Sequence, residues 1–220
     1  SYRTAYAKAN FPLEFYSVYL TYSRARQKPK EEIRSLVSEA KMLGVEIAGP
    51  DVSRANKEFL IEGGKIYFGL SHLKQVSSKD VDVISQNSEH TSSFAGLLRM
   101  HFDKESISPR LRSLAVESLI RSGACDNYGV SRRVMLEIFT VLKSLTPKEI
   151  EFIMSEMVSN NSKTASDVIG LIKTCSEEKC VPKRKQMVFS EADSIDTAEK
   201  DSSRSNISSE RDILGVEFTK

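Results

Sequence analysis

The stretch from Ile66 to Gly129 constrains the fold of this chain most strongly, because short apolar segments alternate there with small polar turns. It opens with a β-prone run over residues 66–70. A polar turn over residues 71–79 leads into an apolar helix, and a second turn follows a helix that ends at Gly123. This order predicts two helix–turn–helix units joined by a linking helix. Such turns present backbone N–H groups at helix N-termini, which bind phosphate without reading base sequence.

Cations and hydroxyl groups lie next to both predicted turns. The serines of the first turn can also cap the helix that follows. In the second turn, arginines flank the glycine that ends a helix, and two more arginines open the next helix. The candidate DNA-binding residues are Lys74, Ser77, Ser78, Lys79, Arg121, Ser122, Gly123, Arg132 and Arg133. This arginine cluster is the most plausible basic face in the sequence. The alternative interpretation is that these arginines lie on an ordinary solvated helix surface.

The order of these motifs resembles the tandem helix-hairpin-helix region of the bacterial family C replicative DNA polymerase, the DNA polymerase III alpha subunit. In that family, a turn that opens with Phe-Gly-Leu is followed by a Leu-Ile-x-x-Gly-Ala-x-Asp turn, and both occur here, from Phe68 and from Leu119. The first turn departs from the usual Lys-Gly-Val-Gly and reads Lys74-Gln75-Val76-Ser77. Because glycine allows close approach to phosphate and unusual dihedral angles, we expect the second hairpin to be the better preserved.

Two stretches near the chain ends carry the same resemblance. Residues 2–15 are similar to the end of the family's fingers domain, which makes Arg3, Tyr6 and Lys8 candidate fingers residues. Core packing is the alternative interpretation of the tyrosines in this part of the chain. Residues 210–216 resemble the Glu-Arg-x-x-Leu-Gly element that leads into the family's OB-fold domain.

A candidate clamp-binding peptide lies in the hydrophilic segment that begins at Cys175. This segment is rich in Ser, Asp, Glu and Lys, and we expect it to be disordered because it has little apolar surface to bury. Within it, Gln186, Met187, Val188 and Phe189 resemble the family's sliding-clamp-binding motif, although one residue is missing. The resemblance implies an extended peptide whose glutamine hydrogen-bonds at a pocket rim while its apolar side chains fill the pocket.

These observations predict a mainly α fold that combines a helical fingers end with a tandem helix-hairpin-helix domain, one small β-hairpin and a disordered C-terminal linker. The β-hairpin is expected around the Gly-Gly turn at residues 63–64. The expected parts are the C-terminal end of a fingers domain over residues 1–58, a tandem helix-hairpin-helix domain that binds DNA and the clamp over residues 59–174, a flexible linker with the clamp motif over residues 175–209, and the start of an OB-fold domain over residues 210–220.

The sequence has no constellation of catalytic or metal-ligating residues. Its three histidines are scattered, and Cys175 and Cys180 have no second pair that would complete a zinc site. An odd number of cysteines fits a reducing cytosol, and no apolar run approaches the roughly 18–20 residues of a membrane span. Polymerase chemistry needs paired aspartates that hold metal ions. The resemblance places them in the palm, so Mg²⁺ is expected for the complete polymerase, and we expect no cofactor and no catalysis in this chain alone.

Two hypotheses of different classes follow. In the first, the chain is part of a DNA-directed DNA polymerase, a nucleotidyltransferase of the bacterial cytoplasm or a phage-infected cell. Its expected partners are double-stranded DNA, the sliding clamp and the remainder of the polymerase, and no membrane is expected. It would hold the DNA non-specifically, and the clamp would tether the enzyme during DNA replication. Because the net charge is only +2, DNA binding must rest on local basic patches. In the second hypothesis, the chain is a non-catalytic helical adaptor with degenerate hairpins that binds a protein partner.

Overall fold

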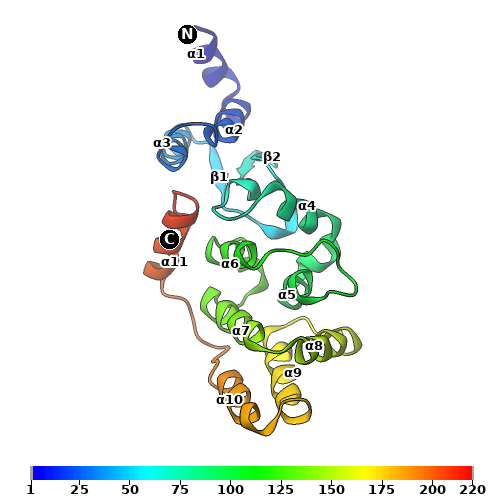
Figure 1. Ribbon diagram of the computed structural model, residues 1–220. Coiled ribbons are helices and arrows are strands. Elements are labelled where there is room, and N and C mark those ends of the chain that lie inside the picture. Colours follow the sequence, from blue (N-terminus) through cyan, green and yellow to red (C-terminus); the bar gives the residue numbers. More distant parts are fainter. Residues whose placement is uncertain (1, 220) are drawn as a thin grey trace.

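The computed structural model describes residues 2–219, apart from the side chains of residues 182 and 183. The described chain is mainly helical, as predicted, and its helices stack in layers along one long axis (Figure 1). The α-helices are α1 (Tyr2–Asn10), α2 (Pro12–Ser23), α3 (Pro29–Met42), α4 (Ser78–Gln86), α5 (Phe94–Phe102), α6 (Ser113–Arg121), α7 (Arg132–Ser144), α8 (Pro147–Ser159), α9 (Ala165–Glu178), α10 (Pro182–Asp193) and α11 (Ser203–Ile213).

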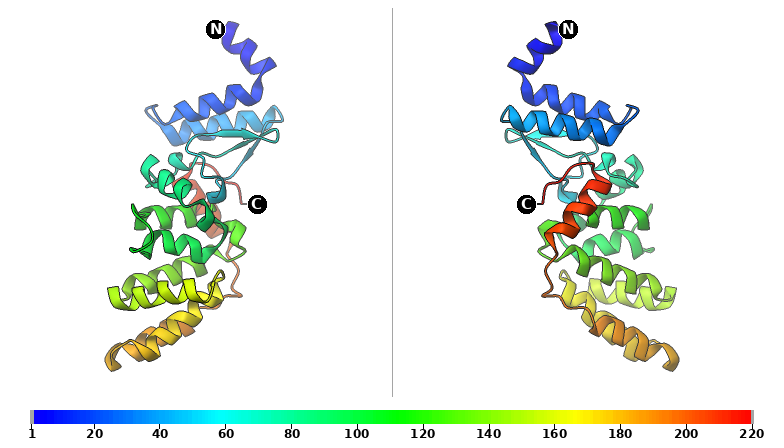
Figure 2. Two further views of the ribbon diagram at one scale, coloured as in Figure 1. Left: turned by 90° about the vertical axis from the view of Figure 1, so that its right-hand side faces the viewer. Right: turned by 90° about the vertical axis from the view of Figure 1, so that its left-hand side faces the viewer.

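A small three-stranded sheet separates α2 and α3 from the helices that follow (Figure 2). Strands β2 (Leu60–Glu62) and β3 (Lys65–Tyr67) form the predicted hairpin, whose turn has left-handed glycines at residues 63 and 64, with φ of 58° and 76°. Strand β1 (Glu46–Ala48) pairs with β3 in parallel, so the order is β1-β3-β2. Ile66 in the central strand is fully buried. The sheet therefore joins the N-terminal helices to the region that contains both hairpins.

Asn10, two positions before a proline, and Ser108-Pro109 are both typical of a helix start and predict one at each place, but the structure differs at both. Asn10 does not cap α2, because its side chain donates to the carbonyl oxygen of Tyr6 in the preceding helix; Phe11 occupies the cap position instead. Ser108 and Pro109 lie in the irregular segment before α6 rather than at its first turn, and the helix begins at Ser113. In contrast, the sequence Thr146-Pro147-Lys148-Glu149 predicts a capping box with proline at the first helical position, and Thr146 forms that capping box at the start of α8.

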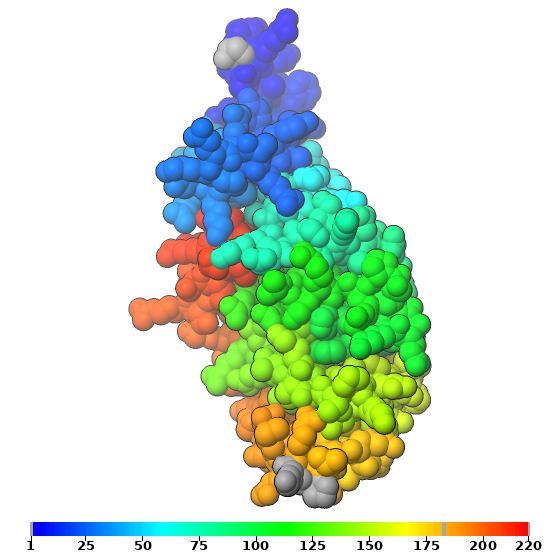
Figure 3. Space-filling model, viewed as in Figure 1, coloured from blue at the N-terminus to red at the C-terminus, as the bar shows by residue number. Residues whose placement is uncertain are grey.

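The hydrophilic segment expected to be disordered is instead largely helical. Helix α9 extends to Glu178, α10 packs against it, and α11 lies beside α6 and below α3 (Figures 1 and 3). Burial of the few apolar side chains in the segment stabilises these helices. Val188 and Ala192 are fully buried, and Ile213 and Leu214 are nearly so. Composition averaged over the segment hides these positions, which all face the helical stack.

Candidate nucleic-acid interface

The first hairpin has a left-handed residue, Gln75, at the position where the turn that it resembles has its first glycine. A short 3₁₀ turn over Leu70–His72 leads through Lys74 and Gln75 into α4. Gln75 has φ of 70°, in the left-handed region that glycine usually occupies. Its side chain, like those of Lys74 and Lys79, is exposed. The turn therefore presents two cations beside the N-terminus of α4, where N–H groups lack helical acceptors.

Ser77 serves the helix itself rather than a ligand. Its Oγ accepts from the N–H of Asp80 at 3.3 Å and donates to the Asp80 carboxylate at 2.6 Å, which completes a capping box. This confirms the expectation that Ser77 caps α4. Its hydroxyl is therefore engaged within the protein, whereas Ser78 lies exposed in the first turn of the helix.

Arg112, the residue before α6, contacts the first hairpin from the second helix-hairpin-helix unit. Its guanidinium donates to the carbonyl oxygen of Gln75 at 3.0 Å and to Asp80, with 2.9 Å between Nε and Oδ1. Asp80 is almost completely buried. Burial alone would raise the pKa of its carboxyl, but the hydrogen bonds from Arg112 and Ser77 lower that pKa below its usual value. The turn is thus held in place by an arginine from outside both predicted turns.

A cavity of about 630 Å³ lies between the first hairpin and the start of α3. Apolar side chains, including Ile33 and Val76, form part of its wall. Five cationic side chains line it against one acidic one, Glu31; the cations are Arg24, Lys28, Lys30, Lys74 and Arg112. Three of these cations come from the α2–α3 connection and the first turn of α3, more than forty residues before the hairpin, so no local pattern in the sequence could group them with it. The cavity extends the basic surface of the first hairpin.

The second turn is tightly packed. Gly123 ends α6 with φ of 85°, as predicted, and a side chain at this position would collide with the Arg132 guanidinium. Ser122 is buried, and its Oγ donates to the carbonyl oxygen of Leu119 at 2.9 Å. Gly123 therefore makes room for Arg132, and the Ser122 hydroxyl points into the protein.

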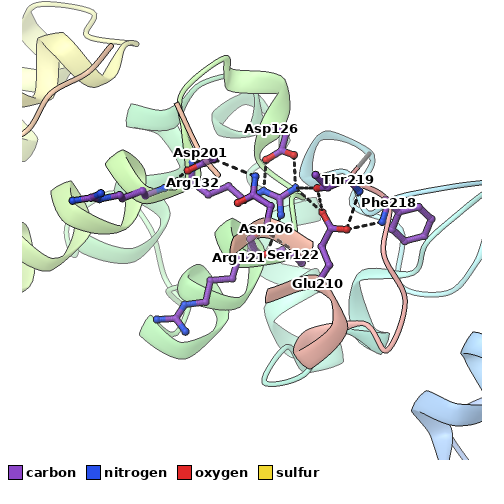
Figure 4. A network of polar contacts seen from close by, with 11 residues as sticks. Arg121, Ser122, Asp126, Arg132, Asp201, Asn206, Glu210, Phe218 and Thr219 are labelled. Carbon is purple, nitrogen blue, oxygen red and sulfur yellow. Dashed lines mark hydrogen bonds and ion pairs between the residues drawn. The ribbon is translucent and has the colours of Figure 1, made fainter. Parts of the chain in front are cut away.

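Arg132 lies at the centre of a buried polar network (Figure 4). It is 5% exposed, and it bonds the Asp126 carboxylate through Nε at 2.8 Å and Nη2 at 2.6 Å. Nη2 also donates to Glu210 of α11 at 2.8 Å. Glu210 accepts further bonds from Phe218 and Thr219. Arg132 thus links the second turn to the C-terminal segment. Its guanidinium is buried and does not present its N–H groups to solvent.

Burial and hydrogen bonding act on Glu210 in opposite directions. Burial raises the pKa of its carboxyl, whereas the hydrogen bonds from Thr219 and the N–H groups of Phe218 and Thr219, together with Arg132, lower it. The net shift of the pKa is downward. Glu210 is therefore a charged carboxylate, and the buried guanidinium of Arg132 balances its negative charge.

The N-terminus of α7 already holds an anion of the same chain. The carboxylate of Asp201 accepts the N–H of Arg132 at 2.6 Å and the N–H of Arg133 at 3.1 Å. The exposed Arg133 side chain pairs with Glu137 at 2.9 Å and with Glu199 at 2.6 Å. The guanidinium of Arg121, in contrast, is exposed and points away from this network (Figure 4).

Comparison with known proteins agrees with this architecture. The family described as helix-hairpin-helix motif matches residues 44–135. The chain is 33% identical over 137 residues to a DNA polymerase III subunit alpha of Aquifex aeolicus, which covers 62% of the chain and 11% of that relative. It is 31% identical over 143 residues to the subunit of Thermus aquaticus, with 65% of the chain and 11% of the relative covered. Residues 44–135 form a helix-hairpin-helix region of the DNA polymerase III alpha family. The chain spans only about a tenth of the length of these relatives.

The three predicted fingers residues lie outside this helix-hairpin-helix region. They belong to α1, at the far end of the helical stack from α10 (Figure 2). Arg3 and Tyr6 are exposed, whereas the Lys8 ammonium pairs with Glu39 of α3. Core packing does not account for Tyr6, because α1 contains no buried residue. The structure therefore does not bring these residues together with the hairpins.

The four clamp-motif residues lie within α10 and not in an extended peptide. Gln186, Met187 and Phe189 are exposed, but Val188 is fully buried against the neighbouring helices. The extended conformation that we expected is thus absent from the structure, because packing of α10 on α9 stabilises a helix.

Over residues 2–219, no group of three or more His, Cys, Asp or Glu side chains is arranged to hold a metal ion. Among the helices of the same described part, none combines the length and the apolarity that a membrane crossing requires.

Proposed function

We propose that this chain is part of a replicative DNA polymerase and holds double-stranded DNA by its phosphate backbone, with the first hairpin as the principal contact. The observation that carries the proposal is the left-handed Gln75 turn, which sets the exposed cations Lys74 and Lys79 beside the N-terminus of α4. The cationic cavity next to this turn supports it. Contacts of this kind bind the backbone without reading bases.

The second hairpin contributes less in this proposal. Arg132 is buried between two carboxylates, Arg133 is paired twice, and the Ser122 hydroxyl points inward. Of the second-hairpin residues predicted to bind DNA, Arg121 is the exposed cation that forms no ion pair within the described part of the chain. Lys74 of the first hairpin is itself paired with Asp212 at 3.3 Å, but the exposed Lys79 forms no ion pair within the described part of the chain. The proposal therefore reverses the ranking expected from the glycines.

The catalytic step belongs, in this proposal, to the palm of the complete polymerase, where paired aspartates would hold Mg²⁺. The relatives are DNA polymerase III alpha subunits, and the chain would hold DNA rather than catalyse nucleotidyl transfer. The sliding clamp is a second proposed partner. Met187 and Phe189 are exposed neighbours on α10, but a Gln-led extended peptide could form only if α10 unwinds and Val188 leaves the core.

Binding of fluorescein-labelled duplex DNA, followed by anisotropy between about 50 and 200 mM salt, tests the proposal. A Lys74→Ala/Lys79→Ala variant should bind at least about fivefold more weakly at the lowest salt. The slope of log K against log salt should fall by about 1.8, because two phosphate contacts are lost. The matched control, Lys104→Ala/Lys148→Ala, removes the same charge from exposed positions on other elements and should change little.

Two results would contradict the proposal. Equal losses in the two variants would mean that general charge, and not the first hairpin, attracts DNA. Absence of salt-sensitive binding by the unchanged chain even at 50 mM salt would remove the DNA-holding role and favour the adaptor hypothesis. The exposed aromatic side chains of α1 and α2, among them Tyr2, Tyr6 and Tyr22, offer such an adaptor a protein-binding surface.

A further inference from the structure

The C-terminal strap, which we define as residues 199–219, places a carboxylate on the first hairpin. Asp212 lies between lysines from two separate elements, with its oxygens 3.3 Å from Nζ of Lys74 and 3.7 Å from Nζ of Lys30. Both lysines line the cationic cavity. The hydrogen bond from Lys74 and the nearby charge of Lys30 lower the pKa of Asp212, so this carboxylate is charged at neutral pH. Two cations that are distant in sequence thus converge on one anion.

The same strap places a second carboxylate on the other hairpin unit. Asp201 bonds two consecutive N–H groups at the start of α7, at 2.6 and 3.1 Å. Those N–H groups have no acceptor within the helix, and the positive end of the helix dipole favours an anion there. A phosphate bound at a helix N-terminus uses the same donors. The Asp201 carboxylate thus occupies the position that a backbone phosphate would take.

Other acidic residues of the strap pair with the cations of the second hairpin. Glu199 pairs with Arg133, and Glu210 pairs with Arg132. Together with Asp212 on Lys74, the strap therefore neutralises three of the residues predicted from the sequence to bind DNA. Figure 2 shows the strap running along one side of the helical stack, across the layers that contain both hairpins.

We infer that Asp201 and Asp212 occupy two phosphate subsites, one at the N–H groups of Arg132 and Arg133 and one between Lys30 and Lys74. A nucleic-acid backbone and the strap then compete for these subsites. The inference rests on the proposed function, and it adds Lys30 and the α7 N-terminus to the DNA-binding surface.

The two carboxylates can leave without dismantling the fold. The Asp212 side chain is 65% exposed, and ion pairs of exposed side chains are weak and screened by salt. Glu210 is 1% exposed and anchors α11 through Arg132 and Thr219. Movement of Asp201 and Asp212 alone would therefore open both subsites while the buried network stays intact.

The experiment compares duplex-DNA binding by the full 220-residue chain and by two double variants. Asp201→Asn/Asp212→Asn removes both carboxylates and keeps the side-chain shape, so the fold should be retained. Asp193→Asn/Glu151→Gln removes the same charge from exposed positions on α10 and α8 and is the matched control. Hydrogen exchange of residues 199–212 is measured with and without DNA on the unchanged chain.

If the strap and DNA compete, Asp201→Asn/Asp212→Asn should bind duplex DNA about tenfold more tightly than the unchanged chain. This gain in affinity should be at least about threefold larger than the gain of the control variant. DNA should also speed hydrogen exchange in residues 199–202 of the unchanged chain, because the backbone displaces Asp201. Equal gains in affinity for the two variants would overturn the inferred competition but would not contradict the proposed binding of DNA. If no variant binds DNA at low salt, both the proposed function and this inference are wrong.

Discussion

Replacing Glu210 by alanine should destabilise the chain more than any other single change of a charged residue in the strap. The substitution removes the acceptor of four hydrogen bonds, from the Arg132 guanidinium, the N–H groups of Phe218 and Thr219, and the Thr219 hydroxyl. It also leaves Arg132, whose side chain is 6% exposed, with Asp126 as its remaining carboxylate partner in the network.

The expected loss is about 3 kcal/mol in the free energy of unfolding. Breaking a buried ion pair by removing one partner costs about 3–5 kcal/mol. The lower end applies here, because the half-exposed Asp126 still compensates Arg132, and the partly exposed Phe218 and Thr219 can be hydrated. With a urea m-value of about 3 kcal/mol per molar, suited to the upper range of small proteins, the midpoint shifts by about 1 M.

Urea unfolding followed by far-ultraviolet circular dichroism measures this shift. Glu199→Ala is the control, because it breaks the pair with Arg133, whose side chain is 64% exposed, and such surface pairs contribute at most about 1 kcal/mol. A Glu210→Ala midpoint equal to that of the control would refute the reasoning. It would mean that the network around Arg132 is hydrated in solution.

Four further outcomes are expected. Gln75→Gly should raise the unfolding free energy by up to about 1 kcal/mol, because glycine relieves the left-handed backbone at φ 70°; a loss in urea denaturation would contradict this. Val188→Ala should cost about 1–3 kcal/mol, whereas the exposed Met187→Ala should stay within about 0.5 kcal/mol, and equal midpoints would argue against a packed α10. Asp80 has a lowered pKa in the folded state, so its contribution is present above its unfolded pKa of about 3.9 and is lost as pH falls through the folded pKa. The destabilisation by Asp80→Asn should therefore shrink between about pH 5 and pH 2, and a constant difference would disprove the linkage. Burial raises the pKa of Cys180 to about 11, so its alkylation by iodoacetamide at pH 7.5 should be slower than that of a free thiol and should accelerate on denaturation.

Local features of the fold could be predicted from the sequence because they depend on neighbouring residues. The Gly63-Gly64 turn, the Thr146 capping box and the left-handed Gly123 each follow from dihedral preferences or from hydrogen bonds within four residues. The helix-hairpin-helix resemblance belongs to the same class, since it is carried by short motifs in a fixed order, and the family match over residues 44–135 confirms it.

The helicity of the C-terminal segment could not be predicted in the same way. Its composition is hydrophilic, and a polar segment by itself cannot compensate the entropy of folding. The existing helical stack supplies the missing apolar surface, against which Val188, Ala192 and Ile213 are buried. The clamp motif, predicted to be extended, is helical for that reason.

The sequence by itself determined where cations, caps and turns occur along the chain, because these properties belong to single residues and their near neighbours. Only the tertiary structure decided which cations stay available to a ligand. Arg132 meets Glu210 across 78 positions of sequence, and Lys74 meets Asp212 across 138. An arginine at a helix start is ordinarily solvated, and its burial depends on whether a distant carboxylate arrives to balance its charge. Electrostatic pairing acts through space, so the folded chain, and not the spacing of its residues, decides which cations remain on the surface that we propose to hold DNA.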